Sequence, residues 1–493
     1  MSTSKTIVKG TLTVLSFLVA GSVIGYLFRL LLARTLSIED FGLYYAIFAF
    51  VSVIYGLKGV GFGTAIVRYV TECKLNNDQQ GIKNLLTTFF LIQFGLSAIF
   101  TLVVLFFAPQ IASEHFHTTK AIIPLIILTI AFLVTTFTTT FKGLFNAYQH
   151  MGYHSLVDFL QSFLTLILTI PLFFLTKTVL APATATLVAY AFTMVWSFWI
   201  ANKLFPIIKT PTKVTKDSAK KLFGFVLPTA LGSLGVSILK SLDTVTLTQF
   251  STLSNVALYN VALPTAQLLR IIPRALTQTL LPVISEQHIK KSGQLPQLLK
   301  NTYAISFAVI TPLVLLFLIF PELIITTIFG PTFVGAALSL RFLSIAMLFA
   351  SFALINQYLL LGLDKPKAYA ITTITGTVIT IILNIVLVKR YGLTGISIAT
   401  LLSNLLLCVL TFWSVSRIIN FQLPWSSWMK TLLASALFII TVTFMKSILH
   451  TNRYAEAIIA SGIAGIVYLA MIHTLKVLTI EEVKKLLQRT PTP

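Results

Sequence analysis

The chain has 493 residues, of which 56% are hydrophobic and 10% are charged, and its mean hydropathy is +0.91. A soluble domain carries about a quarter charged residues, so this composition excludes a soluble enzyme. Polar backbone groups in lipid are satisfied only in helices or closed barrels. Because the apolar runs are continuous rather than alternating, the sequence predicts an all-α integral membrane protein.

The sequence lacks the residues that nucleic-acid, metal and nucleotide-phosphate sites need. The net charge of +22 does not indicate a nucleic-acid partner, because no connection is long enough to form a polar domain. Cys73 and Cys408 are too few for a metal set, and no disulfide is expected between them. The chain has no phosphate-binding Gly-x-x-x-x-Gly-Lys-Ser/Thr loop. No cofactor, no metal and no catalytic residue is therefore predicted.

In chain order, the apolar segments predict about fourteen transmembrane helices, since each needs about 20 mainly apolar residues. Their ranges are 11–33, 41–64, 84–107, 121–145, 155–176, 180–203, 222–248, 256–281, 300–320, 336–361, 368–389, 393–415, 428–449 and 456–476. After Lys476, the pattern Thr479–Glu482 resembles a capping box. Two interpretations of this tail stay open, an amphipathic helix on the inner membrane surface and a solvated segment.

The Lys and Arg residues are distributed unequally between the two sides. Most lie at the start, in the even-numbered connections and in the tail, including six in the connection around 203–221. The odd-numbered connections hold few: Arg34, Lys120, Lys177, Lys389, Arg390 and Arg453. The positive-inside rule therefore predicts a multi-pass protein of the cytoplasmic membrane with both termini and this connection in the cytoplasm.

The two halves of the chain look related. Asp40–Tyr44 is similar to Asn255–Tyr259 at an offset of 215, and Ala185–Leu187 matches Ala399–Leu401 at an offset of 214. Two further pairs, Glu72 with Glu286 and Tyr153 with Tyr369, have nearly the same offset. Two six-helix repeats are predicted, related by an axis along the membrane normal, and transporters keep substrate at such a repeat interface. The expected domains are a first lobe (1–205), a linker (206–221), a second lobe (222–420), two additional helices (421–476) and a tail (477–493).

Basic residues inside predicted spans are the strongest functional signal. Each costs about 2.5–3.5 kcal/mol at a helix centre that faces lipid, so most should face a wet or paired interior. Lys446 lies near a helix end, where it can reach the interface. The other six are predicted to bind an anionic headgroup in a central cavity: Arg29, Lys58, Lys240, Arg270, Arg274 and Arg341. Such an interior suits a large anion.

One carboxylate has a matching basic residue. Arg29 of the first helix corresponds to Asp243 of the seventh at the repeat offset of 214. Residues related by the two-fold axis should face each other across it. The Arg29–Asp243 pair is predicted to form either a structural clamp or a gate that opens during coupling.

Several motifs together resemble a known family, the polysaccharide and O-antigen flippases of the multidrug/oligosaccharidyl-lipid/polysaccharide (MOP) exporter superfamily. The resemblance runs from about residue 8 to 420, and its motifs are Arg29–Arg34, Ser37–Tyr44, Leu227–Pro228, Ser241–Asp243, Leu258–Tyr259 and Leu281–Glu286. It implies a two-lobed bundle like that of multidrug (MATE) exporters, with helices 1, 2, 7 and 8 around the cavity. Ala257, where the family often has glycine, and Pro264 depart from the pattern.

The resemblance also implies a function. The protein would be a flippase, not an enzyme, that carries a polyprenyl-(di)phosphate-linked oligosaccharide to the outer leaflet by alternating access. Its partners would be that lipid, membrane lipids, and the polymerase and glycosyltransferase machinery of surface-glycan synthesis. Three alternatives stay open: a peptidoglycan-precursor flippase, whose substrate has the same sign of charge; a multidrug exporter, whose substrates are usually cations; and a membrane glycan polymerase or ligase, which would need a large outer loop.

Overall fold

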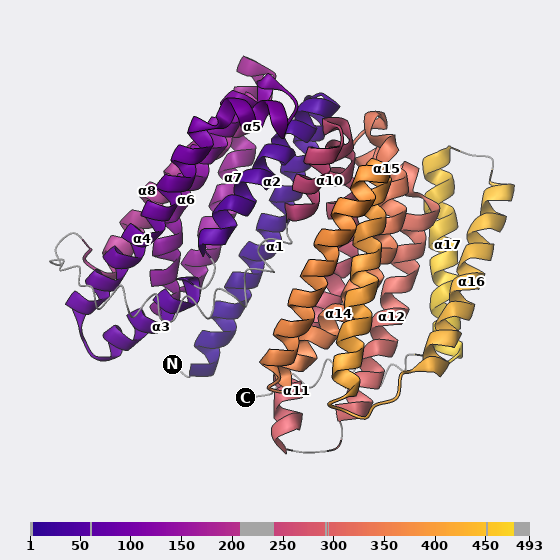
Figure 1. Ribbon diagram of the computed structural model, residues 1–493. Helices are drawn as coiled ribbons and strands as arrows, with labels where there is room; N and C mark the ends of the chain where they lie inside the picture. The colour runs from indigo at the N-terminus through magenta and orange to yellow at the C-terminus, as the bar shows by residue number, and fades with distance from the viewer. Residues whose placement is uncertain are drawn as a thin grey trace. The chain divides into compact units, whose positions relative to one another are not determined.

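A computed structural model (Figure 1) describes residues 3–59, 62–207, 241–290, 293, 295–449 and 452–477. Throughout these ranges the chain forms α-helices and short 3-10 segments, with no strand. The chain divides into two compact units, Met1–Ala257 and Leu258–Pro493. The predicted linker and the predicted tail helix fall largely outside the described residues.

The first unit is built from long helices. Its elements are α1 (Thr3–Thr35), α2 (Ile38–Gly59), α3 (Phe62–Leu75), α4 (Gln79–Phe106), α5 (Ala108–Glu114), η1 (Thr119–Ala121), α6 (Ile122–Ala147), α7 (Met151–Thr176), α8 (Leu180–Leu204) and a helix whose described part is 241–250. Asp78 caps α4, since its Oδ1 accepts the Gly81 N–H at 2.7 Å. Ile66, Phe89 and Phe145 belong to a core that joins α3, α4 and α6.

The second unit follows a similar plan and carries an additional helix pair. Its elements are most of α10 (Leu253–Gln267), then η2 (Leu268–Arg270), α11 (Ile271–Lys290), α12 (Leu295–Ile319), α13 (Pro321–Ile328), η3 (Pro331–Ala336), α14 (Ala337–Gly362), α15 (Pro366–Ser416), α16 (Trp425–Ile448) and α17 (Arg453–Thr474). Phe438 of α16 and Tyr468 of α17 pack in one core with α12. The Tyr468 hydroxyl donates to the Ala308 carbonyl at 2.6 Å, which fastens the pair to the unit.

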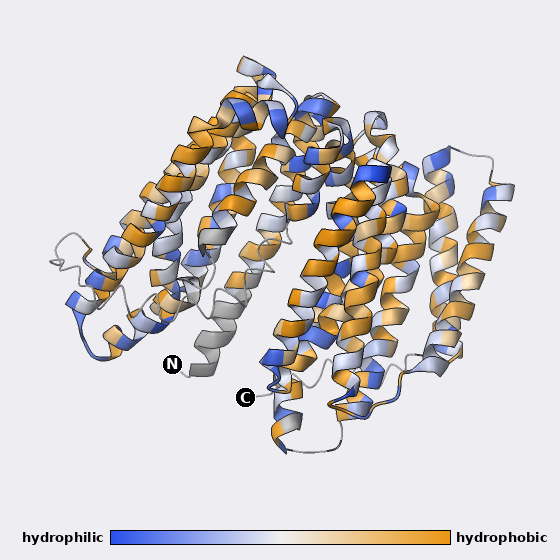
Figure 2. Cartoon of the chain, viewed as in Figure 1, coloured by the Kyte–Doolittle hydropathy of each residue, from blue (hydrophilic) through white to orange (hydrophobic). Residues whose placement is uncertain are grey.

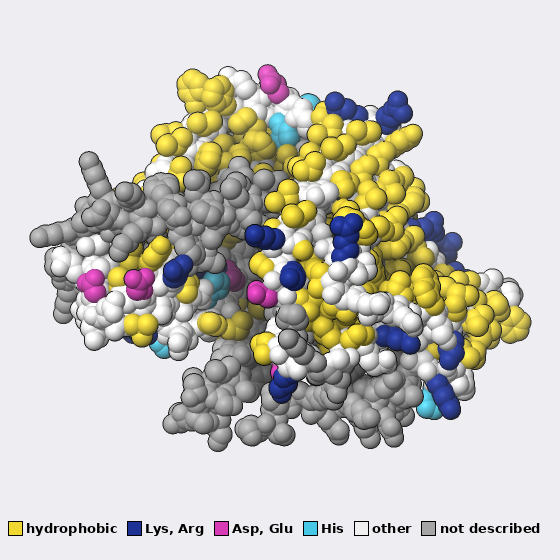
Figure 3. Space-filling view, turned by 60° about the horizontal axis from the view of Figure 1, so that its bottom comes forward, with side chains coloured by type: hydrophobic (Ala, Val, Ile, Leu, Met, Phe, Trp, Pro, Cys, Tyr) yellow, Lys and Arg dark blue, Asp and Glu magenta, His cyan; other side chains and the backbone are white. Residues whose placement is uncertain are grey.

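Eleven helices in the described part of the chain are long and apolar enough to cross a membrane. Hydrophobic residues run along their bodies and hydrophilic residues gather near their ends (Figure 2). In the second unit, hydrophobic side chains cover much of the visible face, and Lys and Arg side chains are scattered among them and along its edges (Figure 3). Ile440, Ile458 and Ile466 are between 61% and 73% exposed, which is expected of side chains that face lipid.

The internal repeat appears as the same hydrogen bond in each unit. Tyr44 of α2 and Thr186 of α8 have their hydroxyls 3.2 Å apart. In the second unit, Tyr259 of α10 and Thr400 of α15 have theirs 3.1 Å apart. The two tyrosines are 215 residues apart and the two threonines 214, which are the offsets of the repeat in the sequence. The matching motifs therefore hold equivalent helices together.

One predicted helix is broken in the structure, and one observed helix was not predicted. The helix predicted over 256–281 is not continuous, because the 3-10 segment η2 separates α10 from α11. Pro264 and Pro273 flank this segment, and each lacks the N–H that would continue the helical ladder. Between the predicted helices 368–389 and 393–415, α15 does bend, at Gly392 with φ 51° and ψ −123°. The helix α3 was not predicted.

Candidate functional site

Arg270 is the basic residue whose surroundings are the most unusual. It ends η2, the break between α10 and α11, and it is half-buried. Its Nε is fully buried and has no hydrogen-bond partner. A guanidinium carries five donors and is always charged, so an unpaired buried N–H costs about 1–3 kcal/mol or more. Arg270 therefore holds a donor that an anionic ligand could satisfy.

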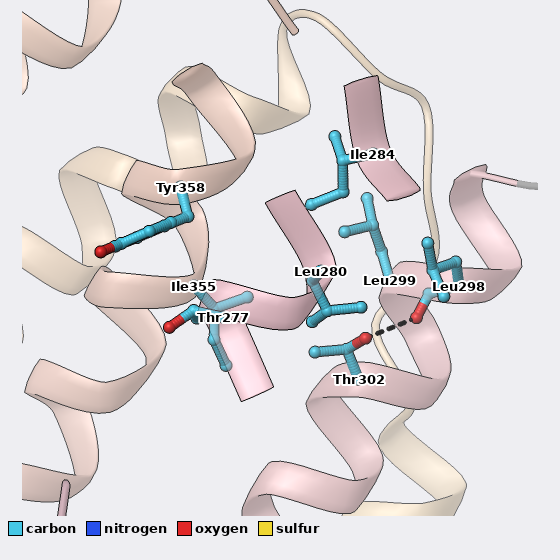
Figure 4. A pocket seen from close by; sticks show the side chains of 8 residues that line it. All are labelled: Thr277, Leu280, Ile284, Leu298, Leu299, Thr302, Ile355 and Tyr358. Atoms are coloured by element: carbon cyan, nitrogen blue, oxygen red, sulfur yellow. Dashed lines mark hydrogen bonds between the residues drawn. The ribbon is translucent and has the colours of Figure 1, made fainter. Parts of the chain in front are cut away.

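Arg274 lies one turn beyond Arg270 and is exposed. The packed side of α11 is different: Thr277, Leu280 and Ile284 face α12 and α14 around a small apolar cavity (Figure 4). This cavity has a volume of only about 10 Å³, so it is a packing gap and not a ligand site. At 100° per residue, Arg274 points about a quarter turn away from this packed side. Arg274 and Ile271 thus share the exposed arc of α11.

Arg341 of α14 already has protein partners. Its Nη2 donates to Glu322 Oε1 at 2.9 Å, and its Nε donates to the Leu318 carbonyl at 3.3 Å. Through these bonds it fastens α14 to α13 and to the end of α12. A substrate would have to compete with Glu322 for this guanidinium. Lys446, by contrast, has its Nζ 4.2 Å from the centre of the Phe320 ring, a cation–π contact.

Arg29 of α1 lies in the first unit, with its guanidinium carbon 4.2 Å from the centre of the Tyr45 ring. Asp243 is half-buried in the helix of residues 241–250. The Arg29–Asp243 pair stays a prediction. Lys240 and the side chain of Lys58 lie outside the described part of the structure, so their predicted roles stay predictions too.

A charged cluster in the first unit is not among the sites predicted from the sequence. Lys142 of α6 donates to Asp158 Oδ1 of α7, and His154 Nε2 lies 3.7 Å from Asp158 Oδ2. Lys142 lies inside the predicted helix 121–145 and was not counted among the intramembrane cations. The i, i+4 spacing of His154 and Asp158, beside a lysine on the preceding helix, was the available signal. The ion pair compensates two charges that would each be costly in lipid.

The two arginines of the broken helix can bind an anion. In the ranges that the structure describes, no group of three or more His, Cys, Asp or Glu side chains could hold a metal ion. Arg270 and Arg274 form a two-step row of positive charge on consecutive turns of one helical segment. Guanidinium groups bind phosphate oxygens through paired hydrogen bonds. The second unit thus carries a candidate anion site on its broken helix.

A family model described as "Polysaccharide biosynthesis protein" matches residues 7–288, which is more than half of the chain. The chain belongs to this family. The family comprises flippase-type membrane transporters, and the resemblance drawn from the sequence motifs is confirmed. The break at η2 with Arg270 lies inside the matched region.

The chain is also similar to several known proteins and solved structures. An uncharacterized membrane protein of Methanocaldococcus jannaschii is 26% identical over 99% of both chains. The probable low-salt glycan biosynthesis flippase Agl15 of Haloferax volcanii is 24% identical over 49% of this chain and 52% of its own. The lipid II flippase MurJ, in an inward closed conformation, has the same fold, with a TM-score of 0.76 over 93% of this chain and 98% of its own at 15% identity. This family member is thus a multi-pass membrane protein with a flippase fold.

Proposed function

We propose that the protein moves an oligosaccharide linked to a polyprenyl phosphate or diphosphate from the cytoplasmic to the outer leaflet. The observation that carries the proposal is the unpaired, buried Nε of Arg270 at a helix break. A lipid phosphate would supply the oxygen acceptors that this donor lacks. Membership of the polysaccharide biosynthesis family and the likeness to a probable glycan flippase support the same substrate class.

Alternating access of two six-helix lobes is the proposed mechanism. The repeated Tyr–Thr hydrogen bond supports equivalent lobes, and α16 and α17 would be the two additional helices of a fourteen-span chain. The distribution of Lys and Arg supports a cytoplasmic location of both termini. Outward movement of the anion would be favoured by an inside-negative potential, by about 2.3 kcal/mol per charge per 100 mV.

The proposed test is export of lipid-linked glycan per folded molecule in cells that depend on this protein. Arg270→Ala should lower it by about 10- to 100-fold, because one hydrogen bond to a charged group contributes about 1.5–3 kcal/mol. Arg270→Lys should recover only part of the activity, because an ammonium keeps the charge and loses the planar fork. Protein abundance and thermal unfolding should change little, because no described protein group depends on the Arg270 Nε.

Arg453→Ala is the matched control. Arg453 begins α17, is exposed and belongs to the additional helix pair, so its loss should leave export unchanged. Normal export per folded Arg270→Ala molecule would exclude a phosphate-binding role. A parallel loss of abundance and export would instead assign Arg270 to holding the fold together.

A peptidoglycan-precursor flippase is the alternative with the same charge. The likeness to MurJ shows the fold alone, because the identity is 15%. Complementation separates the two substrates. The proposal expects rescue of cells that lack a surface-glycan flippase and no rescue of cells depleted of their peptidoglycan-precursor flippase.

A further inference from the structure

The first unit has a cavity of its own, lined by residues other than the predicted basic site residues. Its volume is about 370 Å³, and three segments line it: the first two turns of α2, the connection between α5 and η1 together with Lys120 of η1, and the residues before and within the start of α10. Pockets that bind small ligands have volumes of about 300–1,000 Å³. The cavity is therefore large enough for a small ligand, roughly one or two sugar rings.

The walls of this cavity are fixed by close contacts. Gly42 of α2 packs so tightly that a Cβ atom there would lie 1.9 Å from the Leu253 carbonyl oxygen. Opposite, the His115 Nδ1 donates to Gln249 Oε1 at 2.6 Å, and the Gln249 Nε2 donates to the Glu114 carbonyl at 3.3 Å. The α5–η1 connection is thereby tied to the helix of residues 241–250. A cavity with such walls is largely preformed.

The lining combines an apolar floor with polar groups of both kinds. Leu43 and Phe116, buried to within 2% of full burial, form part of the floor. Carboxylates come from Glu39 and Asp40, an ammonium from Lys120, an imidazole from His117, and hydroxyls from Thr118, Ser251, Thr252 and Ser254. In the described part of the chain, no ion pair joins Glu39, Asp40 or Lys120 to another side chain. These groups remain available to a ligand that both donates and accepts hydrogen bonds.

The charges narrow the class of ligand. Two carboxylates and one ammonium disfavour a polyanion, because its negative groups would meet two negative charges and only one positive charge. A metal ion is not favoured either, because the described residues contain no group of three or more suitable ligands. A neutral or amino sugar fits: its hydroxyls donate to carboxylates and accept from Lys120, and its C–H face suits an apolar floor. Sites built to hydrogen-bond hydroxyl groups discriminate strongly against ligands that lack them.

We propose that this cavity is a glycan-binding subsite for one or two neutral or amino sugar residues. The inference rests on the proposed function, because that function brings an oligosaccharide to this chain. The charge distribution predicts that the α5–η1 connection lies outside the membrane, so the subsite would hold sugar on the release side. It would bind the glycan, whereas the proposed role of Arg270 is to bind the lipid phosphate.

The experiment uses the full-length protein in lipid nanodiscs. Binding of N,N′-diacetylchitobiose, maltose and a glucuronic-acid-containing disaccharide is measured by saturation-transfer NMR and calorimetry. We expect at least one of the first two to bind, and the acidic disaccharide to bind about tenfold more weakly or not at all. Asp40→Asn and Lys120→Gln should each weaken binding of the neutral sugar by about tenfold, which corresponds to 1.4 kcal/mol.

A cavity-filling variant and a matched control complete the design. Thr252→Trp, at an exposed position of the rim, should abolish sugar binding by filling the space. Because the Thr252 hydroxyl accepts the Asn255 N–H at 3.3 Å, the unfolding temperature should fall slightly, as in a Thr252→Ala variant that leaves the space open. Lys177→Gln removes an exposed lysine at the end of α7, outside the cavity, and should bind sugar like the unaltered chain. If Asp40→Asn lowers the unfolding temperature, the test rests on Thr252→Trp and Lys120→Gln, because both substitutions are at exposed positions.

The outcomes separate this inference from the proposed function. Sugar binding that survives Asp40→Asn, Lys120→Gln and Thr252→Trp overturns the subsite, as does binding of Ca²⁺ with no binding of any sugar. Arg270→Ala should leave sugar binding intact while export fails. If export depends on Arg270 and no sugar binds, only the subsite is refuted. If sugar binds and export does not depend on Arg270, only the phosphate-binding role is refuted.

Discussion

Tyr55 and Arg270 occupy equivalent positions of the internal repeat, 215 residues apart, and have opposite surroundings. Tyr55 is buried in the regular helix α2, where its hydroxyl contacts the Thr101 hydroxyl and lies 3.2 Å from the Thr129 carbonyl. Arg270 stands at a 3-10 break, with a buried Nε that has no partner. One position of the repeat thus stabilises its unit, and the other holds a buried cationic donor without a partner.

The two halves of the repeat therefore share the hydrogen bonds that hold their helices together, but they differ in the side chains at the compared position. The Tyr44–Thr186 and Tyr259–Thr400 hydrogen bonds are nearly identical. The first ties α2, which carries Tyr55, to its unit, and the second ties α10, which directly precedes η2 and Arg270, to its own. Prolines are found on either side of the break only in the second unit's segment, at 264 and 273. Missing backbone N–H groups at these positions allow the helix to break there.

The largest effect should come from placing the first unit's residue in the second. Arg270→Tyr should lower export per folded molecule about as strongly as Arg270→Ala, because a phenol cannot supply the guanidinium charge. Tyr55→Phe should instead lower the free energy of unfolding by about 1–3 kcal/mol and leave export per folded molecule nearly unchanged. The paired readouts are glycan export and thermal unfolding. Equal effects of both substitutions on export would erase the distinction between the positions.

A second contrast concerns Gly42 and its equivalent, Ala257. Gly42→Ala should destabilise the protein by about 2–3 kcal/mol, because the new methyl group would overlap the Leu253 backbone carbonyl, which cannot move aside cheaply. Ala257→Gly should cost about 1 kcal/mol, the difference in helix propensity between the two residues. Denaturant or thermal unfolding in detergent measures both. A neutral Gly42→Ala would show that α2 can move away from the start of α10.

Arg29 and Asp243, also related by the repeat offset, test whether equivalent positions meet. If they pair, Arg29→Ala and Asp243→Ala should each impair export, and the double variant should be less impaired than the sum, with a coupling of about 0.5–3 kcal/mol. The four-member cycle of export rates gives this coupling. Strictly additive losses at normal abundance would show that the two residues act independently.

The smallest effect concerns the short helices α5 and α13, which each unit fastens differently. His115, at the end of α5, donates from Nδ1 to Gln249, and its buried Nε2 has no partner. Burial lowers the pKa of His115 below its ordinary value of 6.5, against a smaller raising effect of the Gln249 hydrogen bond. The neutral ring is therefore favoured in the folded state, and its contribution to stability is complete above pH 6.5 and lost as the pH falls below that.

In the second unit, an ion pair of partly exposed side chains, Arg341 with Glu322, fastens α13. Such a pair contributes about 0–1 kcal/mol and is screened by salt. We therefore expect His115→Gln to flatten the fall in unfolding temperature between pH 7 and pH 5, and Glu322→Gln to flatten its dependence on salt. Acid sensitivity that persists in His115→Gln would move the titrating group elsewhere.

How far the sequence predicts the site depends on the residue. The sequence predicts Arg270 as a site residue because a cation far from both ends of an apolar segment is costly in lipid. This prediction does not require the group that contacts Arg270 to be known. Arg341 was assigned to substrate by the same argument, and its guanidinium proves to be held by Glu322, 19 residues earlier in the chain. Lys142 was overlooked, although Asp158 on the next helix compensates its charge. Hydropathy indicates where a charge lies, and it does not identify the group that meets it.

By itself, the sequence determined the helical membrane class, the repeat and the family, because continuous apolar runs and spaced motifs are local properties of the chain. Only the tertiary structure decided two further features: the pairing of Lys142 with Asp158, and the polar cavity between α2, the α5–η1 connection and the start of α10. Each depends on side chains far apart in sequence being brought within contact distance. Helix packing sets those distances, and hydropathy and spacing carry no record of them.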